Sequence, residues 1–104
     1  MNLSIVIPNY NGEELLRKNL PKVFDAISLY KDGKIEVVNA DDCSTDNSIN
    51  ILEDLLSKFR SEFSNIKITI IKNKKNMGFS SNINKGVKNT NGDILILLNT
   101  DVAP

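Results

Sequence analysis

The chain has 104 residues, in which 13 Lys and Arg balance 13 Asp and Glu, and it contains no histidine. Zero net charge argues against a nucleic-acid partner, which selects basic surfaces. The lack of histidine excludes Ser-His and Cys-His catalysis and zinc sites that need histidine. Cys43 is the single cysteine. A single cysteine cannot form an internal disulfide, which predicts a reducing environment. The sequence has no signal-peptide pattern and no apolar run long enough to cross a bilayer, so we expect a cytoplasmic setting.

The first half of the chain predicts a strand, a helix and a second strand. Residues 3–8 form a short β-branched apolar run, and a turn follows at residues 9–12. Asn11 is expected to cap the next helix, with Glu14 completing a variant capping box. Pro21 lies inside the helical pattern and predicts a kink or a break. Residues 35–40 then form the second strand.

The second half continues the alternation. After the polar loop 41–46, Thr45 or Asp46 is expected to cap an amphipathic helix, and residues 66–71 alternate as an edge strand does. A weaker helix over 78–89 precedes the most apolar strand, at 93–98. Four mostly parallel strands alternating with three helices predict an α/β fold, a Rossmann-like three-layer α/β/α half-domain. Such sheets bind ligands beyond the carboxyl ends of their strands, where the strand order reverses.

Polar residues follow three of these strands. Three carboxylates lie within residues 41–46, and a loop-and-cap interpretation explains Asp46 better than Asp41. Asn99 and Asp101 could offer hard oxygen ligands to magnesium or manganese, although this spacing is also common in simple turns. Pro8 and Tyr10 could form a base-stacking wall, or simply a turn with a half-buried tyrosine.

Taken in order, these motifs resemble those of the family 2 glycosyltransferases. The similar segments are residues 4–11 (SIVIPNYN), 41–46 (DDCSTD), 76–79 (NMGF), 84–86 (NKG) and 92–101 (GDILILLNTD). The resemblance implies an A-type glycosyltransferase fold, with residues 1–104 as its nucleotide-diphosphosugar-binding half. The donor is then a sugar attached to UDP, GDP or dTDP, transferred to an acceptor hydroxyl with inversion.

The resemblance also implies roles for individual residues. Pro8 and Tyr10 would line the base and ribose pocket, and Asp41 would accept a hydrogen bond from the base. Asn99 and Thr100 would complete the nucleotide site. Asp101 would coordinate the magnesium or manganese ion, with Asn99 as a second candidate ligand.

Departures from the family pattern carry expectations of their own. Asn99 in place of aspartate removes one charge and is expected to loosen metal binding. Cys43 stands where glycine is usual, so a positive φ there would be strained. Asn39 places a polar side chain at an apolar position of its strand. The general base that inversion requires is expected beyond residue 104, so the chain alone is expected to bind nucleotide weakly and transfer nothing.

Two alternatives remain open from the sequence. A receiver-like signalling domain would use the pair Asp41 and Asp42 to bind magnesium around a phosphorylatable aspartate. A non-catalytic fragment would instead assemble into homo-oligomers through an exposed edge of the strand at 93–98, because an unpaired apolar strand is a template for pairing.

Overall fold

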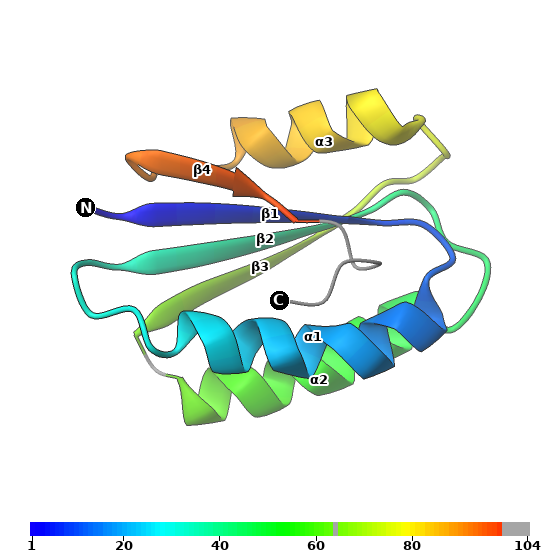
Figure 1. Ribbon diagram of the computed structural model, residues 1–104. Coiled ribbons are helices and arrows are strands. Elements are labelled where there is room, and N and C mark those ends of the chain that lie inside the picture. Colours follow the sequence, from blue (N-terminus) through cyan, green and yellow to red (C-terminus); the bar gives the residue numbers. More distant parts are fainter. Residues whose placement is uncertain (64, 99–104) are drawn as a thin grey trace.

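A computed structural model describes residues 1–63 and 65–98 and has seven elements in alternating order (Figure 1). The strands are β1 (Leu3–Asn9), β2 (Ile35–Asp41), β3 (Ile66–Lys72) and β4 (Ile94–Leu97). The helices are α1 (Glu13–Ile27), α2 (Ser48–Glu62) and α3 (Phe79–Lys88). The predicted Rossmann-like α/β half-domain is confirmed.

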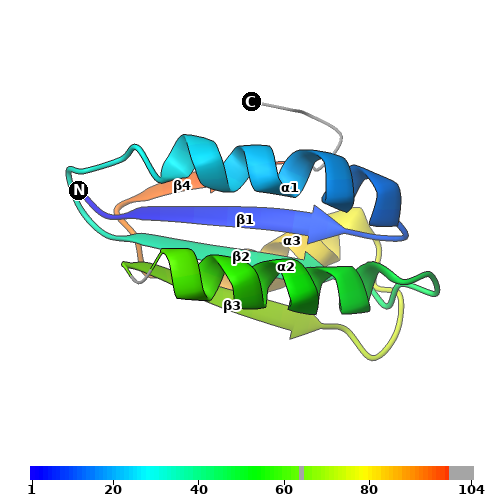
Figure 2. The same cartoon turned by 90° about the horizontal axis from the view of Figure 1, so that it is seen from below.

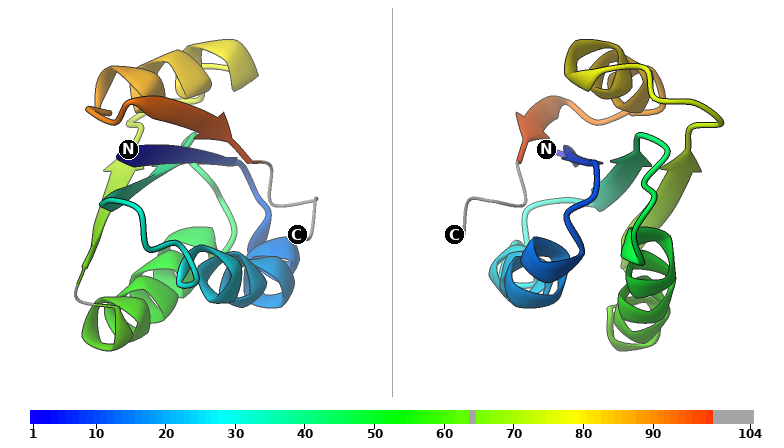
Figure 3. Two further views of the ribbon diagram at one scale, coloured as in Figure 1. Left: turned by 60° about the vertical axis from the view of Figure 1, so that its left-hand side comes forward. Right: turned by 90° about the vertical axis from the view of Figure 1, so that its right-hand side faces the viewer.

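All neighbouring strands pair in parallel, in the order β3-β2-β1-β4, which Figure 2 shows from the side of α1 and α2. The chain adds β2 and β3 on one side of β1 and then places β4 on the other. Strand order therefore reverses at β1, as the sequence analysis expects for a ligand-binding edge. Figure 3 shows the three layers, with α1 and α2 covering one face of the sheet and α3 the other.

The main core lies between the sheet and the pair α1 and α2. Alternate residues of the strands face these helices because successive side chains of a strand point to opposite faces. Phe24 of α1 stacks on Phe59 of α2, with ring centroids 4.2 Å apart. The members of the core with less than a tenth of their surface exposed are Ile5, Ile7, Leu16, Leu20, Val23, Phe24, Ile35, Val37, Ile51, Leu52, Leu56, Phe59, Ile66 and Ile68.

Helix α3 lies close against the opposite face because of Gly86. A Cβ atom at this position would come within 2.7 Å of Val6 Cγ1. The glycine thus lets the helix approach β1 closely. Nearer the amino end of α3, Asn82 donates from Nδ2 to Ala40 O at 2.8 Å, next to the carboxyl end of β2.

The structure corrects two predictions about α1. The helix runs unbroken through Pro21, so the predicted break is wrong, while the alternative of a kink stays a prediction. The carbonyl that Pro21 leaves without a partner belongs to Arg17, whose position is exposed, so water can satisfy it. Asn11 does not cap the helix, whose N-cap residue is Gly12. Instead the Asn11 Oδ1 atom accepts hydrogen bonds from the backbone of Thr45, at 2.7 Å, and Asp46, at 3.3 Å.

The cap predicted for α2 is also wrong. The N-cap residue is Asn47, without a side-chain cap hydrogen bond, and not Thr45 or Asp46. Asp46 Oδ1 still accepts a hydrogen bond from the backbone N–H of Ser48, the first residue of α2, at 2.9 Å.

Two other local predictions are confirmed. Cys43 has a φ of 61°, the left-handed region that its side chain disfavours. Asn39 is completely buried, and neither amide atom finds a hydrogen-bond partner within the described residues.

The two edges of the sheet differ in character. β3 is an edge strand as predicted, and Lys67 and Lys72 point outward from it. β4 forms the other edge and is shorter than the predicted 93–98. All four of its side chains are exposed, between 38% and 53%. Among the described helices, none is both long and apolar enough to cross a membrane.

Candidate nucleotide-binding site

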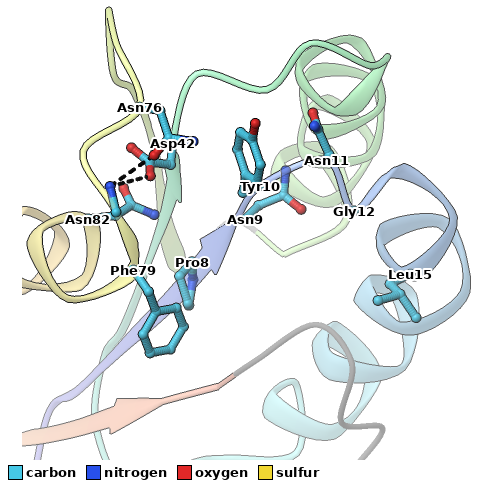
Figure 4. A pocket seen from close by; sticks show the side chains of 11 residues that line it. Pro8, Asn9, Tyr10, Asn11, Gly12, Leu15, Asp42, Asn76, Phe79 and Asn82 are labelled. Carbon is cyan, nitrogen blue, oxygen red and sulfur yellow. Dashed lines mark hydrogen bonds between the residues drawn. The ribbon is translucent and has the colours of Figure 1, made fainter.

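A cleft of about 450 Å³ opens at the carboxyl ends of β1 and β2, below the start of α3 (Figure 4). We call it the strand-end cleft. It is the place where strand order reverses. Its lining residues are Pro8, Asn9, Tyr10, Asn11, Gly12, Leu15, Asp42, Asn76, Gly78, Phe79 and Asn82.

Asp42, the residue after β2, is the one carboxylate among these lining residues. Its side chain is 3% exposed. Oδ1 accepts hydrogen bonds from Met77 N at 2.7 Å and from Asn73 Nδ2 at 2.9 Å, and Oδ2 accepts one from Gly78 N at 2.9 Å. The carboxylate thus lies at the positive end of the α3 dipole.

These contacts decide the charge of Asp42. Burial disfavours the ionised form, but the hydrogen bonds from Met77, Asn73 and Gly78 together outweigh it and hold the pKa of Asp42 below its ordinary value of 3.8. At neutral pH the side chain is therefore an acceptor only. Within the described residues, Oδ2 receives a single hydrogen bond, and it has the capacity to accept another from a ligand.

Asn76 lies beside Asp42 in the cleft (Figure 4). Its Oδ1 atom accepts a hydrogen bond from Gly78 N at 3.0 Å, so the two side chains share this donor. Gly78 itself has a φ of 87°, which only glycine adopts readily. The Asn76 amide nitrogen, on an exposed side chain, is left to face solvent or a ligand.

Aromatic side chains supply the apolar part of the cleft. Tyr10, after β1, is 52% exposed, and Phe79, at the start of α3, is 61% exposed. In the view of Figure 4, Phe79 lies near Pro8, and Tyr10 lies on the same part of the cleft as Asp42. Such exposed rings beside a buried carboxylate form a surface on which a flat heterocycle can stack.

The predicted site residues have different positions in the structure. Pro8 and Tyr10 both line the strand-end cleft. Asp41 does not line it, and its carboxylate is 1% exposed. It accepts hydrogen bonds from Asn9 Nδ2 at 2.8 Å, Ser44 Oγ at 2.7 Å and Ser44 N at 2.9 Å. Asn99, Thr100 and Asp101 lie outside the described residues.

Sequence reasoning did not select Asp42, Asn76 or Phe79 as site residues. For Asp42, the alternation of side chains along β2 contains a signal. Ile35 and Val37 belong to the core under α1 and α2, so Asp41 faces that side as well, and Asp42 is the first carboxylate beyond it. Within the described residues, no group of three or more acidic or cysteine side chains could hold a metal ion.

Known proteins resemble this chain over nearly all of its length. A dolichol-phosphate mannosyltransferase from Pyrococcus furiosus is 30% identical over 98% of the chain. An archaeal dolichyl N-acetyl-alpha-D-glucosaminyl phosphate 3-beta-D-2,3-diacetamido-2,3-dideoxy-beta-D-glucuronosyltransferase, from Methanococcus voltae, is 34% identical over 98%. The chain spans only 26% and 30% of the lengths of these two relatives.

Solved structures share the fold. The mannosyltransferase PcManGT from Pyrobaculum calidifontis, in complex with GDP-Man and Mn²⁺, superposes with a TM-score of 0.80 at 20% identity. That match covers 97% of this chain and 28% of PcManGT. S. aureus TarS 1-349 in complex with UDP gives a TM-score of 0.72 at 25% identity, covering 97% of this chain and 28% of that one.

The family model described as glycosyl transferase family 2 matches residues 4–104. This match covers the strand-end cleft and every element of the fold. The match favours this family over the receiver-like signalling domain, the alternative suggested by the pair Asp41 and Asp42. The chain therefore belongs to glycosyl transferase family 2.

Proposed function

We propose that the strand-end cleft binds the nucleoside part of a nucleotide-diphosphosugar donor for glycosyl transfer. The observation that carries this proposal is Asp42, a buried, ionised carboxylate with one open acceptor site, set beside exposed aromatic rings. A nucleobase offers both an N–H group to such an acceptor and a flat face to such rings.

The polar edge of the cleft suits a base edge that places a donor beside an acceptor. Asp42 Oδ2 accepts and the Asn76 amide nitrogen donates, from side chains that share the Gly78 donor. Every nucleobase has such an edge, so this pair supports a nucleobase without selecting one. We propose UDP, GDP or dTDP donors from the family resemblance, and PcManGT and TarS are complexed with GDP-Man and UDP.

We assign the base-accepting role to Asp42 rather than to Asp41. Both carboxylates are buried and accept three hydrogen bonds each, but Asp42 lines the strand-end cleft and Asp41 does not. Pro8 and Tyr10 keep their predicted places at the base and ribose. The predicted base contact of Asp41 stays a prediction, which the variants Asp41→Asn and Asp42→Asn test.

The diphosphate and its metal belong to the strand end next to β1. Leu98 N donates to Val6 O at 3.0 Å, so the chain leaves β4 at the carboxyl edge, as it leaves β1. We propose that Asp101, with Asn99 as second ligand, holds magnesium or manganese there and that Thr100 contacts the nucleotide. When bound, the ion would neutralise the diphosphate leaving group. PcManGT carries Mn²⁺ together with its GDP-Man.

The complete reaction is proposed for a protein of the relatives' length, of which this chain spans 26–30%. That reaction is inverting transfer to an acceptor hydroxyl, with the general base supplied outside residues 1–104. The chain alone is proposed to bind the donor without transferring its sugar. The cytoplasmic setting also stays a prediction.

A thermal-shift panel of UDP, GDP, dTDP, ADP and CDP, each with and without manganese, tests the donor assignment. A ligand at about one hundred times its dissociation constant should stabilise the protein by roughly 2.7 kcal/mol, a shift of several degrees. We expect a shift with one of the first three nucleotides and none with ADP or CDP. Asp101→Ala should remove the part that needs manganese. An equal shift with all five would contradict the proposed base selection.

The exposed edge of β4 favours a second proposal, self-association. Residues Ile94–Leu97 pair with β1 on one side, and in the described chain no strand pairs with the other. We propose that a second copy adds there. Leu95→Lys should reduce the mass measured by light scattering to that of a monomer, whereas Thr69→Lys on β3 should not. A monomeric wild type at high micromolar concentration would contradict the proposal.

A further inference from the structure

Behind the strand-end cleft, three buried asparagine and aspartate side chains form a hydrogen-bonded chain with a fixed direction. Asn82 of α3 donates from Nδ2 to Ala40 O at 2.8 Å. Asn73, the residue after β3, donates from Nδ2 to Asn82 Oδ1 at 2.8 Å and to Asp42 Oδ1 at 2.9 Å. Asn73 and Asn82 are 5% and 2% exposed.

The direction of these hydrogen bonds follows from the acceptor at each end of the series, Ala40 O and the Asp42 carboxylate. A backbone carbonyl can only accept, so Ala40 O forces Asn82 to point its amide nitrogen at it and its oxygen at Asn73. Asn73 then has to present its nitrogen, since turning the amide over would set its oxygen against two other oxygens. Both of its N–H groups are used, one of them on Asp42. The Asn73 Oδ1 atom has no partner within residues 1–63 and 65–98.

We propose that Asn73 is a positioning residue, which holds the Asp42 carboxylate ionised and aimed into the strand-end cleft through its Nδ2 donor. This inference rests on the proposed function, because it gives Asn73 a role in presenting Asp42 to a nucleobase. Asn73 itself does not line the cleft. Its effect on a ligand is therefore transmitted through Asp42.

Asn73 is suited to this role because it ties three elements together. Its backbone N–H donates to Asp41 O at 2.9 Å, which continues the pairing of β3 with β2 past the strand ends. Its side chain reaches α3 through Asn82. A buried carboxylate without such a donor would gain from taking up a proton. The hydrogen bond from Asn73 thus opposes protonation of Asp42 and also fixes the rotamer of the Asp42 side chain.

Few other charged groups are near enough to supply this effect. The titratable residues around this network are Asp41 and Cys43 on either side of Asp42, Tyr10 in the cleft lining, Lys72 at the end of β3, Lys74 and Lys75 on the loop before α3, and Lys85 and Lys88 on α3. Of these lysines, Lys72 alone makes an ion pair in the described chain, and its partner is Glu53. The three hydrogen-bond donors to Asp42 are therefore neutral groups. Two are the backbone N–H groups of Met77 and Gly78, and the third is the Asn73 side chain.

The test compares Asn73→Asp and Asn73→Leu with Asn50→Asp, an exposed change of equal charge on α2. NMR of the carboxyl carbons follows the titration of Asp42 without any nucleotide. We expect its midpoint to rise in both Asn73 variants and to stay in place in Asn50→Asp. An unchanged Asp42 midpoint in the Asn73 variants would overturn the inference. If Asn73→Leu does not fold, the near-isosteric Asn73→Asp decides alone.

Binding supplies the second readout, with whichever of UDP, GDP and dTDP stabilises the wild type. When protonated, the carboxylic acid of Asn73→Asp can donate to Asp42 as the amide does; when ionised, it repels Asp42. Between pH 5 and pH 8 its affinity should therefore fall about tenfold more than that of wild type, the loss of one charge-assisted hydrogen bond. A merely structural role would give parallel pH profiles, which would contradict the inference.

The two proposals can fail separately. If none of the three nucleotides binds the wild type, the donor assignment fails, while the Asp42 titration still decides whether Asn73 positions the carboxylate. If nucleotides bind but the Asp42 midpoint ignores Asn73, the donor assignment stands and the positioning role is wrong.

Discussion

Asp41 and Asp42 are neighbours in sequence, yet they belong to two regions with opposite properties. Asp41 lies in a closed cluster on the α1 and α2 side, where it accepts three hydrogen bonds from Asn9 and Ser44 and does not line the strand-end cleft. Asp42 also accepts three hydrogen bonds, but it lies on the α3 side and lines the cleft. The difference shows how one strand end can supply a structural carboxylate and a ligand-binding one, because successive residues point to opposite faces.

Asp42→Asn should have the largest effect, on binding and stability together. The new amide would set N–H groups against the donors of Asn73, Met77 or Gly78. We expect nucleotide affinity to fall at least tenfold and the free energy of unfolding to drop by about 2–3 kcal/mol, the cost of unmatched buried donors. Calorimetric titration and urea unfolding measure the two. Retained affinity in a folded variant would assign the base contact elsewhere.

The same variant should change the response to acid. Because the folded pKa of Asp42 is below its ordinary 3.8, its ionised form stabilises the fold above that pH. The wild type loses this stability as the pH falls below 3.8 and through the folded pKa. Asp42→Asn has no such contribution to lose, so its stability curve should be flatter there.

Asp41→Asn should affect stability alone and so sharpens the comparison. The new amide keeps one oxygen that can accept from Ser44 or Asn9, but its nitrogen replaces the second acceptor oxygen of the carboxylate. We expect a loss of about 2 kcal/mol in urea unfolding, with nucleotide affinity changed less than about twofold. A tenfold loss of affinity with normal stability would instead support the base contact first predicted for Asp41.

Asn39→Val should act in the opposite direction, within the same closed region. The Asn39 side chain is wholly buried beside Ile7 and Ile70 in the sheet, and its amide makes no hydrogen bond to the described residues. An apolar, β-branched replacement removes that penalty. We expect about 1–2 kcal/mol of added stability in urea unfolding. Destabilisation would show that the amide has a partner, such as a buried water.

Cys43→Gly should give the smallest effect, at the loop joining the two regions. Cys43 has a φ of 61°, where a side chain is strained and glycine is not. We expect a gain of at most about 1 kcal/mol, reduced by the greater freedom of glycine in the unfolded chain. Thermal unfolding measures it, and Cys43→Ala, which keeps the strain, is the matched control. Equal stability of the two variants would contradict a strained Cys43.

Much of the fold could be predicted from local patterns. The apolar runs at β1 and β2 and the helical spacing of α2 fix their elements, and the alternation of the elements fixes the α/β class. Pro21 misled because its cost depends on whether the freed carbonyl faces water. The site was predicted only in part. Pro8 and Tyr10 follow directly from the end of β1, whereas Asp42 depends on where β2 ends.

The residues behind the cleft could not be predicted from spacing. Asn73 is 31 residues from Asp42, and it reaches that residue only because β3 pairs with β2 in one register. Asn82 joins them only because Gly86 brings α3 down onto the sheet. Such contacts are properties of the packed structure, and asparagines at these positions otherwise look like ordinary polar residues of a loop and a helix.

The central claim is that Asp42 and the aromatic rings around it form a nucleotide site. An NMR titration of the isotope-labelled chain with UDP, GDP and dTDP in manganese-free buffer tests it most directly. The account predicts that one nucleotide shifts the amide signals of Tyr10, Asp42, Gly78 and Phe79, and that Asp42→Asn abolishes these shifts. Shifts confined to the amino ends of the strands, around Leu3 and Glu36, would contradict it.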